Sequence, residues 1–217
     1  MSKEKVIFDY DPKKRNHLYP VLRPVSTPLI HIVFKYDLIG KENLPENGGF
    51  ILACNHVTAI DPVFLVSSIA PKEVHFMGKD ELFEKPFSRW FLTGMNGFPI
   101  HRQGVDVKGI KYAEALLEQG DVLGIFPEGT RSKTREPQRA KAGVALIAKA
   151  THADVVPMSI YFSEKPHYRS RLTVRIGEPI RYEELGLSDE ERNTQELRAA
   201  AALVMERIKA LWSMGHA

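Results

Sequence analysis

The chain has 217 residues, of which 43% are hydrophobic and 26% charged. This composition is typical of globular proteins, and the length allows a sizeable core. A formal net charge of +3 permits anionic partners without requiring them, and the single cysteine, Cys54, excludes an intramolecular disulfide. Because the charged N-terminus does not look like a secretory signal and no stretch approaches the roughly 20 apolar residues of a spanning helix, we expect no membrane span.

Residues 1–45 are predicted to form a separate N-terminal region. Between Tyr10 and Arg23, basic residues stand among aromatic and aliphatic ones, a composition that suits an anionic membrane surface. Pro20, Pro24 and Pro28 argue against one long helix, so we expect two short helical pieces or a helix and an extended arm. The sequence is compatible both with membrane contact and with an arm packed over the core.

From residue 46 onward, strand-like and helix-like runs alternate. The continuous apolar run 50–54 is typical of a strand buried on both faces, whereas 172–176 alternates as an edge strand does. Further strands are predicted at 74–77, 97–101, 122–126 and 155–161, and helices at 63–71, 106–117, 142–150 and from about residue 194. This order predicts an α/β domain, 46–217, whose mixed, largely parallel sheet is flanked by helices and preceded by the short N-terminal helical or extended region.

The segment from His56 to Asp61 directly follows the first predicted strand and brings an imidazole close to a carboxylate. Imidazole readily takes up a proton at neutral pH, and a carboxylate on its other ring nitrogen fixes the tautomer and stabilises the imidazolium. Beside this pair there is no Gly-x-Ser-x-Gly segment and no convincing catalytic cysteine. We therefore expect a substrate hydroxyl to be the nucleophile, with His56 as general base and Asp61 as its orienting partner.

The same spacing also has a purely structural interpretation. Thr58 and Asp61 match a capping box, in which Thr58 is the N-cap of the next helix and Asp61 its third residue. Asp61 would then bond only the start of that helix. A carboxylate turned back toward Thr58 also points at the loop that carries His56, so the two interpretations are compatible.

A second block, 126–132, follows another predicted strand, at the end where α/β sheets usually bind ligands. Gly129 allows the backbone to approach a ligand closely, and the planar guanidinium of Arg131 matches phosphate oxygens. Glu128 has two predicted roles, which are to hold Arg131 in position or to accept a bond from a substrate hydroxyl. The alternative is a polar turn with a surface ion pair. The positive charge then continues through Lys133, Arg135, Arg139 and Lys141.

Two features lie between these blocks. Arg102 would clamp one phosphate together with Arg131 if the strand order brings them together, whereas His101 is interpreted as a strand-end residue because no carboxylate stands at a matching spacing. Around 83–91, aromatic and basic residues stand at helical spacing, which favours core packing, with an interfacial or acyl-chain surface as the alternative. The eight histidines are scattered, so no metal site is predicted.

Four segments in this order resemble the four sequence blocks of the glycerolipid acyltransferases, and especially those of the bacterial 1-acylglycerol-3-phosphate acyltransferase group. The segments are 55–61, 97–102, 126–132 and 155–160, and the likeness extends from about Gly40 to Ile180. Two positions depart from the family pattern. Thr58 stands where Ser is common, and His101 stands where many members carry Asp.

The resemblance implies that His56, oriented by Asp61, deprotonates a free glycerol hydroxyl that then attacks an acyl thioester. The implied donor is acyl-CoA or acyl-carrier protein, the acceptor is lysophosphatidate and the product phosphatidate, with no cofactor and no nucleic acid. A lipid product implies peripheral contact with a membrane surface at the cytoplasmic face. The residues implied to bind the acceptor phosphate are Arg102, Glu128, Gly129 and Arg131, with Thr130 supporting the loop, and Pro157 is implied to bind the donor or shape the site.

Other functions are compatible with the same residues. The chemistry could act on another acceptor, such as glycerol 3-phosphate, a lysophospholipid or an acylated amino-lipid. A thioester hydrolase would use water instead, but the arginines predicted to bind phosphate argue against it. A non-catalytic lipid-binding or scaffolding protein would have no need of the base at His56.

Overall fold

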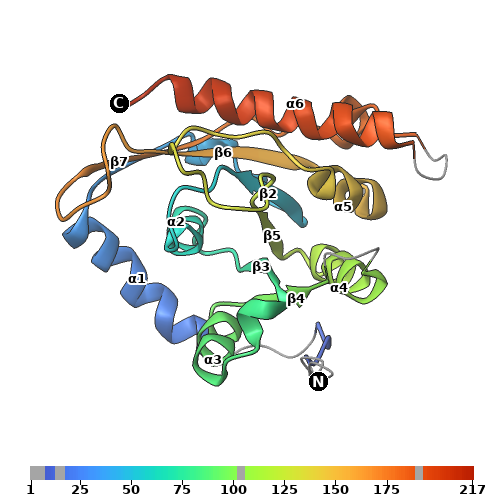
Figure 1. The fold of residues 1–217 in the computed structure, drawn as a ribbon, viewed down its shortest axis with the longest axis horizontal. Coiled ribbons are helices and arrows are strands. Elements are labelled where there is room, and N and C mark those ends of the chain that lie inside the picture. Colours follow the sequence, from blue (N-terminus) through green and yellow to red (C-terminus); the bar gives the residue numbers. More distant parts are fainter. Residues whose placement is uncertain (1–7, 13–17, 102–105, 189–192) are drawn as a thin grey trace.

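The computed structural model describes residues 8–12, 18–101, 106–188 and 193–217, which are built around a seven-stranded sheet (Figure 1). The strands lie in the spatial order β1-β7-β6-β2-β5-β3-β4. Neighbouring strands are parallel except β6 and β7, which are antiparallel, so the predicted mixed, largely parallel sheet is confirmed. The strands are β1 (Lys35–Ile39), β2 (Phe50–Cys54), β3 (Val74–Lys79), β4 (Gly97–Ile100), β5 (Val122–Ile125), β6 (Val155–Tyr161) and β7 (Arg171–Ile176).

Helices connect most of these strands, and their positions agree with the predicted alternation. Asp106 caps one of them, because its Oδ1 accepts a hydrogen bond from the Gly109 N–H at 3.0 Å. The α-helices of the described residues are α1 (Tyr19–Val33), α2 (Asp61–Ser68), α3 (Pro86–Gly94), α4 (Val107–Glu118), α5 (Gly143–Thr151) and α6 (Thr194–Ser213), and short 3-10 turns lie at 41–43, 80–83 and 182–185.

Both faces of the sheet are covered by helices, as predicted (Figure 1). Along β2, Ile51 and Ala53 belong to one apolar cluster, whereas Phe50, Leu52 and Cys54 belong to another. This alternation follows from the strand geometry, since successive side chains point to opposite faces. Side chains of α4, α5 and α6 complete the first cluster, and side chains of α1 and α2 complete the second.

The first helix differs from its prediction. The prolines were expected to prevent one long helix, but residues 19–33 form one helix, α1, which contains Pro24 and Pro28, whereas the described residues before it, 8–12 and 18, are not helical. Each proline removes an N–H and frees the carbonyl four residues earlier. Pro20, Pro24 and Pro28 all lie on the exposed side of α1, where solvent can satisfy the freed carbonyls, so the helix continues.

One edge of the sheet also differs. The prediction that 172–176 lies at an edge is wrong, because β7 is enclosed between β6 and β1. Within the N-terminal region 1–45, β1 was not expected at all. Its charged residues, Lys35 and Asp37, weaken the strand pattern, and such charges are typical of edge strands. β1 is held in parallel register with β7, where Arg171 Nε donates to Asp37 Oδ2 at 2.9 Å.

The centre of the sheet determines where the predicted blocks meet. β2 lies between β5 and β6 and is parallel to both, so the carboxyl ends of the three strands lie at the same edge of the sheet. The segment that carries His56 follows β2, and the segment 126–132 follows β5. These two loops therefore lie side by side.

Candidate active site

His56 and Asp61 form the predicted imidazole–carboxylate pair, with His56 Nδ1 at 2.7 Å from Asp61 Oδ2. The Asp61 side chain is fully buried, whereas that of His56 is 19% exposed. The carboxylate also accepts hydrogen bonds from the backbone N–H groups of Val57 (2.6 Å) and Thr58 (2.9 Å). Because these donors stabilise the ionised carboxylate, Nδ1 carries the hydrogen that it shares with Asp61, and Nε2 is left to accept a proton.

The capping interpretation needs correction. α2 begins at Asp61 itself, with Ile60 as N-cap, so Asp61 is the first and not the third helical residue. The Thr58 hydroxyl does not cap an N–H of α2 but donates to Asp61 Oδ1 at 2.6 Å. At the first helical position the carboxylate turns back over the preceding loop and collects its donors there. Thr58 therefore helps to orient the Asp61 carboxylate and does not compete with His56 for it.

The imidazole of His56 is also held by an aromatic ring. Phe126, the first residue after β5, stacks on it with ring centroids 4.1 Å apart and an interplanar angle of 19°. Stacking fixes the ring plane, while the Asp61 bond fixes its rotation within that plane. Both constraints leave Nε2 in one orientation, which is what a general base requires.

Glu128 fastens the two loops together at His56. Its Oε1 accepts the His56 backbone N–H at 2.9 Å, and the Ser132 N–H donates to the His56 carbonyl at 2.8 Å. Glu128 is 2% exposed, and its Oε2 has no hydrogen-bond partner among the described residues. Burial raises the pKa of the Glu128 carboxyl, against hydrogen bonds from the His56 and Gln138 backbones that lower it. This positioning contact was not foreseen, because nothing in the sequence indicates which backbone group a buried carboxylate reaches.

Gly129, Thr130 and Arg131 follow directly. Gly129 has φ +68°, a left-handed conformation that favours glycine, and the turn leaves Thr130 and Arg131 exposed. Arg131 makes no hydrogen bond or ion pair with another described residue, so the predicted Glu128–Arg131 contact is absent from that part of the chain. Because this guanidinium has no partner among the described residues, it can bind an incoming anion.

Pro157 lies away from the dyad. It is buried in β6, in register with Ala53 of β2, three residues before His56. Its carbonyl accepts the Gly177 N–H at 2.8 Å. Its described contacts lie within the sheet, and its predicted role in binding the donor or shaping the site stays a prediction.

The segment 97–102 is described only as far as His101. Arg102 lies outside the described residues, so its predicted pairing with Arg131 stays a prediction. His101 Nδ1 lies 2.6 Å from Asp80 Oδ2, so a carboxylate does accompany this histidine. Asp80 follows β3 and His101 follows β4, and the sequence could not reveal their contact because parallel pairing of the two strands creates it.

Asn55 is a further positioning residue that the sequence analysis did not single out. Its side chain is fully buried and bonds both backbone groups of Ile160, donating to the carbonyl at 3.0 Å and accepting the N–H at 2.8 Å. These bonds extend the β2–β6 pairing by one residue and hold the backbone immediately before His56. A buried amide at the end of an apolar strand was the available signal.

The aromatic stretch 83–91 divides into a buried and an exposed part. Phe83 is buried, as core packing predicts, but Phe87, Trp90 and Phe91 of α3 are exposed. Among the described residues, no helix is both long and apolar enough to cross a membrane. The described part likewise contains no group of His, Cys, Asp or Glu residues arranged to hold a metal ion.

The class of enzyme emerges when this chain is compared with known proteins. Residues 35–161, which contain the dyad and both loops around it, match the family model described as Acyltransferase. Because the match spans more than half of the 217 residues, the chain belongs to the acyltransferase family and is an O-acyltransferase. The family resemblance seen in the sequence is thereby confirmed.

Individual relatives narrow the comparison. A Bacillus subtilis protein named 1-acyl-sn-glycerol-3-phosphate acyltransferase is 34% identical over 175 residues, covering 79% of this chain and 85% of the relative. A Helicobacter pylori protein of the same name is 30% identical over 200 residues, covering 83% and 82%. The crystal structure of the 1-acyl-sn-glycerophosphate acyltransferase PlsC from Thermotoga maritima has the same fold, with a TM-score of 0.65 at 24% identity, covering 89% of this chain and 80% of that one.

Proposed function

We propose that this enzyme transfers a fatty acyl group from a thioester to the free hydroxyl of 1-acylglycerol 3-phosphate, which yields phosphatidate. The observation that carries the proposal is the His56–Asp61 pair, whose Nε2 bonds no described residue, on a loop that contacts the segment carrying Arg131, whose guanidinium has no partner among the described residues either. The names of the Bacillus subtilis and Helicobacter pylori relatives support this acceptor. The donor is a thioester of CoA or of acyl-carrier protein.

The reaction needs one proton-transfer cycle. His56 Nε2 takes the proton of the acceptor hydroxyl as that oxygen attacks the thioester carbonyl carbon. The carbon–sulfur bond then breaks, and the departing thiolate takes up the proton that His56 holds. Asp61 stabilises the imidazolium between these steps, and the enzyme ends in its starting state. No covalent acyl-enzyme is required.

Arg131 supplies the acceptor specificity in this proposal. Its guanidinium binds the phosphomonoester of the acceptor, while Gly129 and Thr130 let the backbone approach. Glu128 contributes by fixing His56 through the His56 backbone N–H, while its own Oε2 is buried and has no partner among the described residues. Arg102 is proposed as the second phosphate ligand.

The acceptor is a lipid, so we propose peripheral binding to the cytoplasmic face of a membrane through α1 and α3. Four apolar residues of α1 are exposed at helical spacing, and three aromatic residues of α3 join them: Val21, Val25, Leu29, Ile32, Phe87, Trp90 and Phe91. The two helices touch, because Gly94 of α3 lies against Leu18 and Leu22 at the start of α1. An exposed apolar surface of this kind is typical of proteins that dock on lipid.

The test is an acyl-transfer assay of the purified protein with acyl-CoA or acyl-carrier protein and a panel of lyso-acceptors. We expect transfer to lysophosphatidate and a fall in turnover of about 10²–10⁴-fold in His56→Ala. Arg131→Ala should raise the acceptor KM and lower kcat, since the phosphate positions the hydroxyl. Arg207→Ala, on the exposed side of α6, is the control and should do neither.

Three results would contradict the proposal. Unchanged turnover in His56→Ala would remove His56 from the mechanism. Release of free fatty acid at the same rate with and without an acceptor would identify a thioester hydrolase. Transfer to glycerol 3-phosphate but not to its acylated form would change the acceptor.

A further inference from the structure

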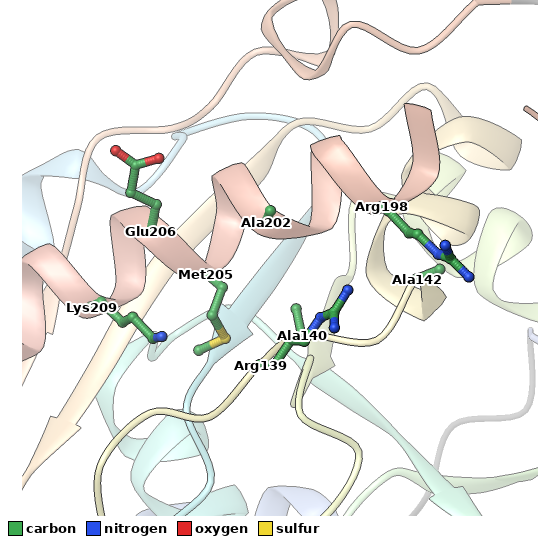
Figure 2. Close-up of a pocket in the computed structure, with 8 residues that line it drawn as sticks. All are labelled: Arg139, Ala140, Ala142, Arg198, Ala202, Met205, Glu206 and Lys209. Carbon is green, nitrogen blue, oxygen red and sulfur yellow. The ribbon is translucent and has the colours of Figure 1, made fainter. Parts of the chain in front are cut away.

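A second group of cationic side chains lines a cavity of about 370 Å³ between the loop 139–142 and α6 (Figure 2). Three of its lining residues are cations, namely Arg139 from the loop and Arg198 and Lys209 from α6. The nearby Met205 and Ala202 provide an apolar wall. The mechanism proposed above uses none of these residues.

Among the described residues, the cations of this cavity have no partner. None of the three cations makes an ion pair or a hydrogen bond with another described residue. Glu206 is the one carboxylate that lines the cavity, and Figure 2 shows its side chain leaving α6 on the side opposite to Lys209 and Met205. Guanidinium and ammonium groups that line one cavity can bind phosphate oxygens.

The cavity and the active-site loop share one short segment of chain. Lys141 lies between the cavity-lining residues Ala140 and Ala142, and its N–H donates to the Pro127 carbonyl at 2.8 Å. Its side chain lies against Gly129, where an added Cβ would stand 3.1 Å from Lys141 Cδ. An anion bound by the cavity would therefore lie next to Lys141, the residue that contacts the 126–132 loop.

We propose that this cavity binds the phosphate end of the phosphopantetheine arm of the acyl donor. The inference rests on the proposed function, in which two phosphorylated substrates react. Arg131 serves the acceptor phosphate, so the donor needs a separate anion site at a distance from the thioester. CoA carries a diphosphate and a 3′-phosphate at that end, and acyl-carrier protein carries one phosphodiester. A volume of about 370 Å³ suits such a group and excludes a whole carrier protein.

The main experiment uses the variant Arg139→Gln/Arg198→Gln. It measures the KM for each acyl donor, which is acyl-CoA or acyl-carrier protein loaded with an acyl group. We expect the KM for the donor to rise at least tenfold, with kcat within about twofold and the acceptor KM unchanged. Acyl-pantetheine lacks all phosphates, so the wild type and the variant should use it equally. Arg207→Gln, on α6 but outside the cavity, is the matched control and should behave as wild type.

The two donors identify the source of the phosphate. A rise for both supports a site for the phosphate common to both arms, and a rise for acyl-CoA alone assigns the cavity to the additional phosphates of CoA. An unchanged KM for both donors, an equal loss with acyl-pantetheine, or an effect confined to the acceptor KM would overturn the proposal. Loss of binding to anionic vesicles with unchanged donor kinetics would overturn it in favour of a lipid headgroup site.

Direct binding separates this inference from the proposed function. Isothermal titration calorimetry measures the affinity of CoA for the wild type, the double variant and Arg207→Gln, and it requires no turnover. If the enzyme does not acylate lysophosphatidate but CoA binding is lost only in the double variant, the proposed acceptor is wrong and the cavity proposal stands. If transfer occurs and CoA binds all three proteins equally, the cavity proposal is wrong and the proposed function stands.

Discussion

At the scale of single residues, Asp61 shows how a fully buried charge can be kept in this site. Its two oxygens receive four hydrogen bonds, from the His56 ring, the Val57 and Thr58 backbones and the Thr58 hydroxyl. A buried carboxylate is costly unless it is paired and hydrogen-bonded, and here every donor comes from the loop that carries the base. The contacts that stabilise the charge are therefore the same ones that orient His56.

Glu128 is a buried carboxyl of the opposite kind, because one of its oxygens has no partner among the described residues and burial raises its pKa. A carboxyl whose pKa is raised on folding favours the folded state at low pH, and this contribution is lost as the pH rises through the folded-state pKa. Glu128→Gln does not titrate but keeps an oxygen for the His56 N–H. We therefore expect the difference in Tm, Glu128→Gln minus wild type, to increase as the pH rises from 4 to 8.

The measurement is thermal unfolding of both proteins across that pH range. Glu128→Ala is the control, since it removes the acceptor of the His56 N–H and should lower Tm at every pH while reducing kcat more than Glu128→Gln does. A Tm difference between Glu128→Gln and wild type that stays constant with pH would show that the carboxyl does not titrate differently on folding.

At the scale of elements, the pairing of β2 with β6 determines where the His56 loop starts. Asn55 continues this pairing with its side chain, because it bonds both backbone groups of the buried Ile160. Asn55→Leu has a similar size but leaves a buried N–H and a buried carbonyl unsatisfied. We expect a loss of about 2–4 kcal/mol in the free energy of unfolding and reduced kcat, because His56 is the next residue.

Chemical denaturation and the transfer assay test this together. Asn43→Ala is a suitable control, since its side chain donates one bond to the Ile176 carbonyl at 2.9 Å, away from the dyad. It should cost about 1 kcal/mol and leave kcat unchanged. If Asn55→Leu is as stable and active as Asn43→Ala, the amide bonds do not position the loop.

The elements also show which features the sequence could predict. The buried strands were predictable because both of their faces are apolar, and the dyad was predictable because Asp61 stands only five residues after His56. β1 was not predicted because its charged residues weaken the apolar pattern of a strand. The His101–Asp80 contact was not predicted because the pairing of two parallel strands creates it. The Glu128 bond and the cavity beside α6 depend on packing between segments distant in the sequence, which no local pattern specifies.

At the scale of the whole molecule, the proposed substrates approach from different sides. The exposed apolar residues proposed to meet the membrane belong to α1 and α3, whereas the cationic cavity is formed with α6, which packs on the opposite face of the sheet from α1 (Figure 1). The dyad follows β2, between these faces. In the proposed function, the lipid acceptor would arrive from the α1 side and the water-soluble donor from the α6 side, so that the two would meet at His56.

This arrangement predicts that membrane binding depends on α3. Phe87 and Trp90 are 75% and 54% exposed, and transfer of such side chains from water into the membrane interface is worth about 1.5–3 kcal/mol each. Phe87→Ser/Trp90→Ser should therefore weaken binding to anionic vesicles by about 10²-fold in a sedimentation assay. Met214→Ser, which removes an exposed apolar side chain at the end of α6, should bind vesicles as wild type does. Equal losses in the two variants would mean that binding has no preference for the α3 surface, and the acceptor would then have to reach His56 by another side.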